Sequence, residues 1–429
     1  MGRKIRSIDI YTCHISKLIV ATILVLSISM AVPAEVIPVC TEGCGFASIQ
    51  EAIEAAVPGD VIEVQSGTYS ENVNITKQLT LKGVDTGAGK PVVDAGCKGS
   101  AITLYADGIV LEGIRMENSY SDGIVSWAGI KVISNNNTII GNTVKLNQNG
   151  IEVASNNNTI IDNIVESNGI VLTSSSSNTI SGNTVTYSEY GIRLISSSDN
   201  FVADNNLSGN IYGLLLNSSD DNIVKGNKAN DNDYGILLDS SVGNNLTDNL
   251  MYENIYNFGA DGDNDIDISN IVNDGKRIYY IVGSSGEIIK SDAGAVYCIN
   301  CDNMSINGLV LSNGIYGIYF YNTTNSTVEN NSLFKNGCGI GLVESSNNTI
   351  RSNDISSNED GTGIRLQNCI GNDVYTNEIS QNKYGIYYDE YSYIKNNLDN
   401  NQMSGNYEDH HLSAGVAKPP GARPKKKSK

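Results

Sequence analysis

Apolar and polar residues alternate in short runs that return along the chain at a nearly fixed interval. In the run that begins at Gly191, apolar Ile192 and Leu194 flank Arg193, and a turn rich in Ser and Asn follows. Alternation with a period of two predicts strands whose apolar side chains face inward. A Gly followed by Ile or Leu opens such a run at 129, 150, 169, 191, 213, 235, 317, 339, 363 and 385.

A second motif, typified by Asn-Thr-Ile, keeps the same interval. It stands at 137, 158, 178, 200, 222, 325, 348 and 372. Self-similarity with one fixed period is typical of stacked solenoids, and these units are too short to hold a crossover helix. We therefore predict an all-β fold, a right-handed parallel β-helix solenoid of about 12 coils of about 22 residues each.

Recurrent Asn residues predict columns that stack along the solenoid. Asn178, Asn200 and Asn222 belong to one column, and Asn183, Asn205 and Asn227 belong to another. Asn tolerates the left-handed backbone of tight turns, and stacked amides can bond along a column. These residues are therefore interpreted as scaffold.

A short helix is expected near the start of the solenoid. Ser48 is a capping residue with Glu51 three positions later, and Ile49, Ala52 and Ile53 share one face with Ala56. Such a helix would cover the open core of the first coil.

The predicted organisation has six parts. They are a signal peptide at 1–34, an N-terminal cap and first coils at 35–100, coils at 101–250, an insert that interrupts the repeat at 251–300, coils at 301–408, and a disordered basic tail at 409–429. Within the insert, the runs RIYYIVG and EIIKS suggest a pair of strands.

The N-terminus carries the features of an export signal. Arg3, Lys4 and Arg6 precede an apolar run from Leu18 to Val32, and Val32-Pro33-Ala34 resembles a cleavage site. An uncleaved membrane anchor is the alternative. Later segments are not apolar enough to span a membrane, so we expect a secreted or cell-surface protein without a transmembrane span after cleavage.

Charge and cysteines narrow the choice of partners. The formal net charge is −19, which disfavours nucleic acid as a partner. Cysteines in an exported chain can form disulfides, and we expect Cys97 to bond to Cys40 or Cys44. Cys298 and Cys301 have metal-ligand spacing, but no second pair with zinc spacing exists in the sequence.

The residues also carry a family resemblance. The opening FASIQEAIEAAVPGDVIEVQSGTYSENV resembles the N-terminal cap of pectin-lyase-like β-helix proteins. The run DIDISNIVNDGKRIYYIVG and the coils after it are similar to NosD-type proteins and to the carbohydrate-binding and sugar-hydrolysis repeats of archaeal surface proteins. The resemblance implies a β-helix and three roles: glycan binding, cleavage or epimerisation of polysaccharide, or service to a copper enzyme.

Residues that depart from the repeat are the candidates for function. Tyrosines before the Gly-Ile step could form a strip that lies against sugar rings: Tyr190, Tyr212, Tyr234, Tyr316 and Tyr384. A ladder stabilised by self-stacking is the alternative. Catalytic candidates are two outward arginines and two nearby carboxylates: Arg193, Arg365, Asp220 and Asp221. Alternating carboxylates could bind Ca²⁺, the one cofactor that the sequence suggests: Asp261, Asp263, Asp265 and Asp267.

The leading hypothesis is an exported, non-catalytic β-helix that binds glycans or takes part in a surface layer. A polysaccharide lyase, hydrolase or epimerase is the first alternative. A NosD-like accessory protein for copper-enzyme maturation is the second, although only His410 and His411 follow the signal, with Met403 nearby. Asn-x-Ser/Thr sequons such as Asn206-Leu-Ser208 would permit glycosylation.

Overall fold

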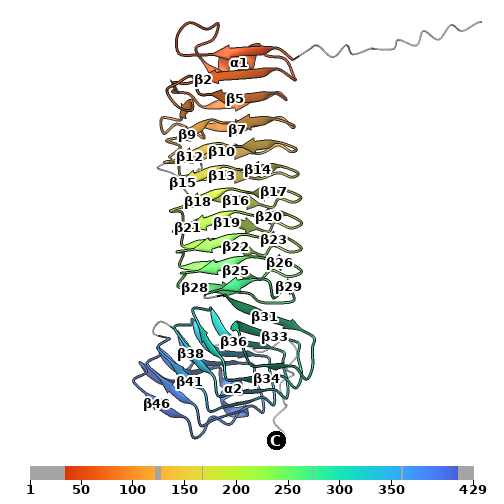
Figure 1. Cartoon of the computed structure of the whole chain (residues 1–429), viewed down its shortest axis with the longest axis vertical. Coiled ribbons are helices and arrows are strands. Elements are labelled where there is room, and N and C mark those ends of the chain that lie inside the picture. The colour runs from red at the N-terminus through yellow and green to blue at the C-terminus, as the bar shows by residue number, and fades with distance from the viewer. Residues whose placement is uncertain (1–33, 121–126, 167, 274, 359–360, 414–429) are drawn as a thin grey trace, which may run out of the picture. The chain divides into compact units, whose positions relative to one another are not determined.

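The computed structural model describes residues 34–120, 127–166, 168–273, 275–358 and 361–413. It is a β-solenoid of about 17 turns, and Figure 1 shows its coils stacked from β2 to β28. The predicted fold class is confirmed, but the expected count of 12 coils was too low. The Gly-Ile motif is missing from the first coils, so the motif alone does not give their number. The proposed signal peptide, except Ala34, and residues 414–429 of the basic tail lie outside the described residues.

Before residue 273, the coils contribute short strands to three parallel sheets. The first sheet consists of β1 (Val36–Val39), β2 (Val61–Gln65), β5 (Thr80–Val84), β8 (Val110–Glu112), β11 (Thr138–Ile140), β14 (Thr159–Ile161), β17 (Thr179–Ser181), β20 (Phe201–Ala203), β23 (Ile223–Lys225), β26 (Asn245–Thr247) and β29 (Asp265–Ile266). The second consists of β4 (Val73–Ile75), β7 (Ile102–Leu104), β10 (Ala128–Val132), β13 (Asn149–Val153), β16 (Ile170–Thr173), β19 (Tyr190–Ile195), β22 (Tyr212–Asn217), β25 (Tyr234–Asp239) and β28 (Tyr256–Gly259).

The third sheet continues through both halves of the solenoid. It begins with β3 (Thr68–Tyr69), β6 (Val92–Asp94), β9 (Arg115–Glu117), β12 (Thr143–Lys145), β15 (Ile164–Glu166), β18 (Thr184–Thr186), β21 (Asn206–Ser208), β24 (Lys228–Asn230), β27 (Leu250–Tyr252) and β30 (Ile271–Val272). It continues with β31 (Lys276–Val282), β33 (Ala293–Ile299), β36 (Tyr316–Tyr321), β39 (Cys338–Val343), β42 (Thr362–Gln367), β45 (Tyr384–Tyr388) and β47 (Glu408–Leu412).

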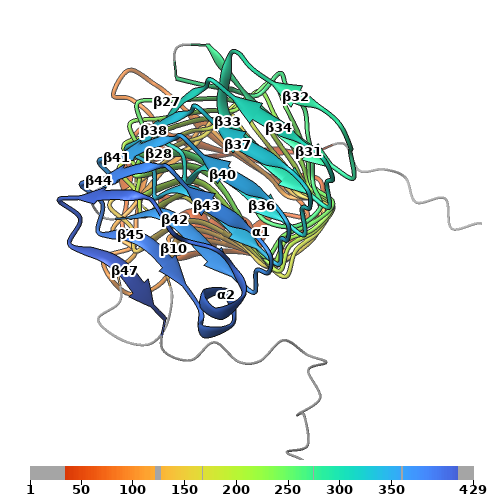
Figure 2. The same ribbon diagram turned by 90° about the horizontal axis from the view of Figure 1, so that it is seen from below.

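Two further sheets complete the coils after residue 275. One consists of β32 (Ile288–Ile289), β34 (Ser305–Asn307), β37 (Thr327–Glu329), β40 (Thr349–Arg351) and β43 (Asp373–Tyr375). The other consists of β35 (Val310–Ser312), β38 (Ser332–Phe334), β41 (Asp354–Ser356), β44 (Glu378–Ser380) and β46 (Gln402–Ser404). We call the coils before residue 273 the N-terminal segment and those after 275 the C-terminal segment. The helix α2 (Glu390–Lys395) lies between β45 and β46 in sequence, and Figure 2 shows β47 beside β45 at this end.

The helix α1 (Ile49–Ala55) closes the first coil as the sequence predicts. The Ser48 hydroxyl accepts the Glu51 N–H at 3.3 Å, and Ile49, Ala52 and Ile53 are buried against the core. Burying these apolar side chains removes the end of the core from water. In the part of the chain described here, no helix combines the length and apolar character needed to cross a membrane.

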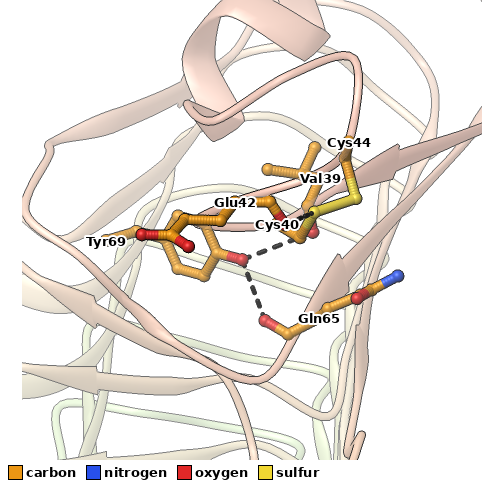
Figure 3. Close-up of a disulfide and its surroundings, with 6 residues drawn as sticks. All are labelled: Val39, Cys40, Glu42, Cys44, Gln65 and Tyr69. Carbon is orange, nitrogen blue, oxygen red and sulfur yellow. Dashed lines mark hydrogen bonds between the residues drawn. A yellow bond between two sulfur atoms is a disulfide. The ribbon is translucent and has the colours of Figure 1, made fainter.

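The disulfide near this cap differs from the expected one. Cys40 and Cys44 are bonded to each other, and Cys97 is free and exposed, so the predicted bond from Cys97 to either was wrong. The turn after β1 brings the two Cα atoms within 5.5 Å, a normal disulfide separation. Figure 3 shows the bond beside Tyr69, whose hydroxyl donates to the carbonyl oxygen of Gln65 at 2.9 Å.

The segments meet at a reversal of chain direction. The strand β30 pairs with β31 antiparallel, whereas every other strand pairing among the described residues is parallel. The expected insert is thus built into the solenoid: β27 to β30 complete the N-terminal segment. The suggested pairing of RIYYIVG with EIIKS was wrong, because β31 pairs with β33 while β32 pairs with β34. The predicted tail begins too early, since residues 409–412 belong to β47.

The strand β33 is buried on both faces. Ala295, Tyr297 and Ile299 join the core of the N-terminal segment, whereas Val296 and Cys298 join the core of the C-terminal segment. A strand between two cores needs an uninterrupted apolar run, which explains why AGAVYCI does not alternate with polar residues.

Inward Asn side chains bond coil to coil at the corners. The Oδ1 atom of Asn205 accepts the backbone N–H of Asn183 at 3.0 Å, and its Nδ2 donates to the Ile180 carbonyl at 3.0 Å and to Asn227 Oδ1 at 2.9 Å. The predicted columns are confirmed, and Asn210, Asn232 and Asn254 form a third.

Replacing one of these buried amides should destabilise the solenoid strongly. We expect Asn205→Ala to lower the free energy of unfolding by about 2–4 kcal/mol, because buried donors and acceptors lose their partners. Exposed Asn206 is the matched control, and Asn206→Ala should change it by less than about 0.5 kcal/mol. Urea unfolding followed by circular dichroism measures both, and equal losses would contradict the structural role of the column.

Candidate functional site

Four tyrosines form one ladder on the outer face of the second sheet. Parallel register places Tyr190, Tyr212, Tyr234 and Tyr256 in consecutive coils. The rings of Tyr190 and Tyr212 stack with centroids 5.4 Å apart, and those of Tyr212 and Tyr234 with centroids 4.8 Å apart, both at 12°. Because ring faces lie against neighbouring rings, edges and hydroxyls are what a ligand could reach. The sequence motif missed Tyr256, since its coil reads Tyr-Asn-Phe instead of Tyr-Gly-Ile.

The other two predicted tyrosines lie outside this ladder. Tyr316 packs against Tyr319, with ring centroids 4.6 Å apart, and burial raises the pKa of its hydroxyl. Tyr384 contacts the imidazole ring of His411 at 4.2 Å between centroids. The five candidates therefore do not form a continuous strip, and carbohydrate binding by them stays a prediction.

A cleft of about 230 Å³ opens at the Tyr190 end of the ladder. It is lined by Asn149, Glu152, Asn168, Val171, Thr173, Glu189, Tyr190 and Arg193. Gly150 and Gly169 are 19 residues apart, whereas Gly169 and Gly191 are 22 apart. The shorter coil starts its strand at Ile170 and carries Asn168 where the next coil carries Tyr190, so a small side chain stands at the ladder's end.

Arg193 is held over this cleft by an aromatic ring. Its Cζ atom lies 4.4 Å from the centroid of Tyr190, a cation–π arrangement. The Nε atom is buried without a hydrogen-bond partner, and within the described ranges no carboxylate forms a salt bridge with this guanidinium. Desolvation raises the pKa of Tyr190, and Glu189 adds to the rise. A cation with unused donors thus faces the cleft.

The remaining catalytic candidates occupy structural positions. The Asp220 carboxylate accepts the N–H of Val242 in the next coil at 2.8 Å, and Asp221 is a turn residue with φ of 55°. Arg365 lies in the C-terminal segment, where it donates to Gln367 at 2.9 Å and to the Tyr316 hydroxyl at 3.4 Å. None of these three residues lines the Arg193 cleft.

The four alternating aspartates point to different partners. Asp261 accepts from the Ser240 N–H at 2.9 Å and Asp263 from the Asn300 amide at 3.1 Å. Asp265 accepts from the Asn245 amide at 2.8 Å and Asp267 from the Ser269 N–H at 2.7 Å. Across the described residues no group of three or more His, Cys, Asp or Glu side chains is placed to hold a metal ion. Calcium binding stays a prediction that this geometry does not support.

Sulfur side chains gather in one coil of the C-terminal segment. Cys298, Cys301 and Met304 are all buried in its core, with at most 2% of each exposed. A hydrogen bond between the two thiols lowers the pKa of Cys301 to about 7, and the same contact together with burial raises the pKa of Cys298. The sequence marked the cysteine pair but not Met304, which is buried in the same core.

Comparison with known families identifies the chain. The model described as "NosD: Periplasmic copper-binding protein (NosD)" matches residues 88–285 and 263–417. The chain belongs to the NosD family. This confirms the predicted resemblance to NosD-type proteins. A search of curated proteins found no match.

Solved structures that resemble this NosD-family chain include three polysaccharide- or surface-related proteins. The mannuronan C-5 epimerase AlgE4 A-module of Azotobacter vinelandii shares 15% identity over 86% of this chain and 95% of its own, with a TM-score of 0.28. A PL6 alginate lyase with a trisaccharide shares 14% over 83% and 85%, with 0.43. PfbA, a surface adhesin of Streptococcus pneumoniae, shares 13% over 74% and 87%, with 0.37.

The family description implies copper, so the donors present are compared with what copper binds. His410 and His411 are consecutive in β47 and point to opposite sides of the strand: His410 pairs with inward Ile386, and His411 with outward Tyr387. They therefore cannot chelate one ion together. The buried thiols of Cys298 and Cys301 and the thioether of Met304 are soft ligands that suit Cu(I). In this chain the sulfur side chains fit copper better than the histidines do.

Thiol reactivity should separate exposed from buried cysteines. Burial raises the pKa of Cys338 and of Cys369 to about 12, so both stay protonated and unreactive as pH rises from 7 to 10. Exposed Cys97 should be alkylated by iodoacetamide in the folded protein. Mass spectrometry of peptides from folded and unfolded protein measures this. Modification of Cys338 or Cys369 in the folded protein as fast as that of Cys97 would contradict the burial described here.

Proposed function

We propose that this NosD-family protein is an exported, non-catalytic β-helix that binds glycan in the Arg193 cleft. The family description as periplasmic and the predicted export signal support export. Glycans of an envelope or surface layer are the partner class, since they meet exported proteins and carry the hydroxyls and carboxylates that this cleft can recognise.

The observation that carries the proposal is the state of Arg193. Its guanidinium is fixed on Tyr190 and has a buried Nε without a partner. The amides of Asn149 and Asn168 and the hydroxyl of Thr173 border the same cleft. Such a set can donate to sugar hydroxyls or to a uronic-acid carboxylate, and charge-assisted bonds from arginine are the stronger ones. A sugar ring would meet the edge and hydroxyl of Tyr190, because Arg193 and Tyr212 cover its faces.

The carboxylates that border the cleft favour binding over hydrolysis. Glu152 lies on the coil two below Arg193, with Val171 between them in register. Its carboxylate lies 3.5 Å from the Lys131 ammonium, so it is already engaged in an ion pair. If Glu152 or Glu189 cleaved polysaccharide, the protein would be an enzyme, and the proposal of a non-catalytic binding protein would be wrong.

Removing the Arg193 side chain should weaken glycan binding. We expect Arg193→Ala to raise the Kd for bound uronic-acid or neutral glycans at least about 10-fold, which corresponds to about 1.4 kcal/mol. Isothermal titration against a glycan panel, with and without calcium, measures the change. Arg351 lies in β40 and is paired with Glu329, so Arg351→Ala is the control that should leave the Kd unchanged.

Two results would contradict the proposal. Shortened or unsaturated glycan products in the same incubations would show that the protein is an enzyme and not only a binding protein. If a glycan bound the wild type and Arg193→Ala with equal Kd, the binding site would not be this cleft.

A further inference from the structure

A second groove opens beside the Arg193 cleft, at the corner between β18 and β19 (Figure 1). It has a volume of about 510 Å³ and is lined by Tyr187, Ser188, Glu189, Gly209, Asn210, Ile211, Asp231 and Asp233. Glu189 also lines the Arg193 cleft, so the two hollows meet at this residue. Together they form one path that runs from the outer face of the second sheet to the corner between the third sheet and the second.

An aromatic ring stands open to solvent in this corner groove. Tyr187 is 84% exposed, whereas the ladder tyrosines lie against one another's rings. The Tyr187 ring crosses the next coil at Gly209, where a Cβ atom would lie 3.2 Å from both its Cδ1 and its Cε1. Beside it, Ile211 is 44% exposed. The glycine therefore supports the ring on one side, and the remaining ring surface is free to contact a ligand.

Packing within the coils does not explain an aromatic residue at this corner. The equivalent residues of the next three coils are Gly209, Asp231 and Glu253, each just before the corner Asn. All four have positive φ, with 54° at Tyr187, and bulky residues adopt this conformation rarely. Because the Tyr187 ring buries little of its surface, it adds little to the hydrophobic stability of the core. A role at the surface accounts for it better.

The corner groove combines this ring with three carboxylates. Glu189, Asp231 and Asp233 are exposed, and among the described residues that line the groove none is basic. Carboxylate oxygens accept hydrogen bonds from sugar hydroxyls, and an aromatic ring offers an apolar surface to the C–H groups of a pyranose. Three like charges repel a sugar that itself carries a carboxylate. The corner groove therefore suits an uncharged sugar, whereas Arg193 suits an acidic one.

We propose that Tyr187 forms a second subsite, which takes an uncharged sugar next to the sugar that Arg193 holds. The inference rests on the proposed function, because it extends the glycan bound in the Arg193 cleft. It also names the glycan class: an oligosaccharide in which an acidic sugar is followed by an uncharged one. A homopolymer of uronic acids would instead bring a carboxylate to Glu189, Asp231 and Asp233.

The test is isothermal titration of the full-length protein with three oligosaccharides of equal length. The first alternates glucuronic acid with N-acetylglucosamine, the second consists of uronic acid alone, and the third consists of N-acetylglucosamine alone. We expect the alternating oligosaccharide to bind most tightly, with a Kd at least about 10-fold below that of the uronic-acid oligomer.

Substitutions in the corner groove should change this preference. We expect Tyr187→Ala to raise the Kd for the alternating oligosaccharide about 10-fold and to leave that for the uronic-acid oligomer unchanged. Tyr187→Phe keeps the ring and should retain most of the affinity. Asp233→Asn removes one repelling charge and should tighten binding of the uronic-acid oligomer. Tyr407 is 88% exposed but lies in the C-terminal segment, so Tyr407→Ala is the control that should change no Kd.

The outcomes separate this inference from the proposed function, once thermal unfolding has shown that each variant folds. Equal Kd values of wild type and Tyr187→Ala for the alternating oligosaccharide would overturn the second subsite, as would a wild type that binds the alternating and uronic-acid oligomers equally. If Arg193→Ala weakens binding in either case, the Arg193 cleft still stands. If instead Tyr187→Ala weakens binding and Arg193→Ala does not, the sugar site at Tyr187 stands and the Arg193 cleft fails. A protein that binds none of the three oligosaccharides would overturn both.

Discussion

Buried backbone groups at the corners of each coil are the constraint on which the rest of this solenoid depends. Where the chain turns between strands, its N–H groups cannot bond along a sheet, and burial without a partner is costly. An inward Asn bonds to both kinds of group on the preceding coil. The Oδ1 of Asn222 accepts the Asn200 N–H, and its Nδ2 donates to the Ser197 carbonyl. The amides also bond to each other, so every coil completes its neighbour's hydrogen bonds.

This constraint gives meaning to the positions that depart from it. A coil that loses a corner Asn must satisfy its neighbours in another way, as Ser326 does for the Met304 N–H at 2.9 Å. The Met304 side chain has no oxygen that could accept a corner N–H of the neighbouring coil. The Arg193 cleft follows from a departure of another kind, the shortening of one coil, which removes bulk from the outer face and leaves the core intact.

The structure could be predicted from the sequence wherever one coil repeats the pattern of the next. The Gly-Ile strands, the columns of Asn178 and Asn183, and the helix capped by Ser48 follow from local pattern, because each is determined by contacts to residues about one coil away. The count of coils was too low because the first coils carry other apolar residues in place of the Gly-Ile motif, such as Val73 and Ile75 in β4. Only part of the site could be predicted from the sequence. Arg193 and the tyrosines differ from the repeat and were identified as candidates. The cleft was not predicted, because it depends on the lengths of the coils and on the position of Asn168 after the coils stack. The Cys40–Cys44 bond depends on a turn whose conformation no repeat specifies.

The junction between the segments could not be derived from periodicity, because it depends on tertiary contacts between residues far apart in sequence. The Tyr297 ring packs edge-on against Phe258 with centroids 5.5 Å apart, and its hydroxyl donates to the Phe258 carbonyl at 3.3 Å. The other face of the same strand carries Cys298 into the second core. One strand therefore serves as the end cap of the N-terminal segment and as a wall of the C-terminal one. In a solenoid each coil contacts only its neighbours. Here the loss of β33 would expose both cores at once, so the middle of the chain is the place where the two segments stabilise each other.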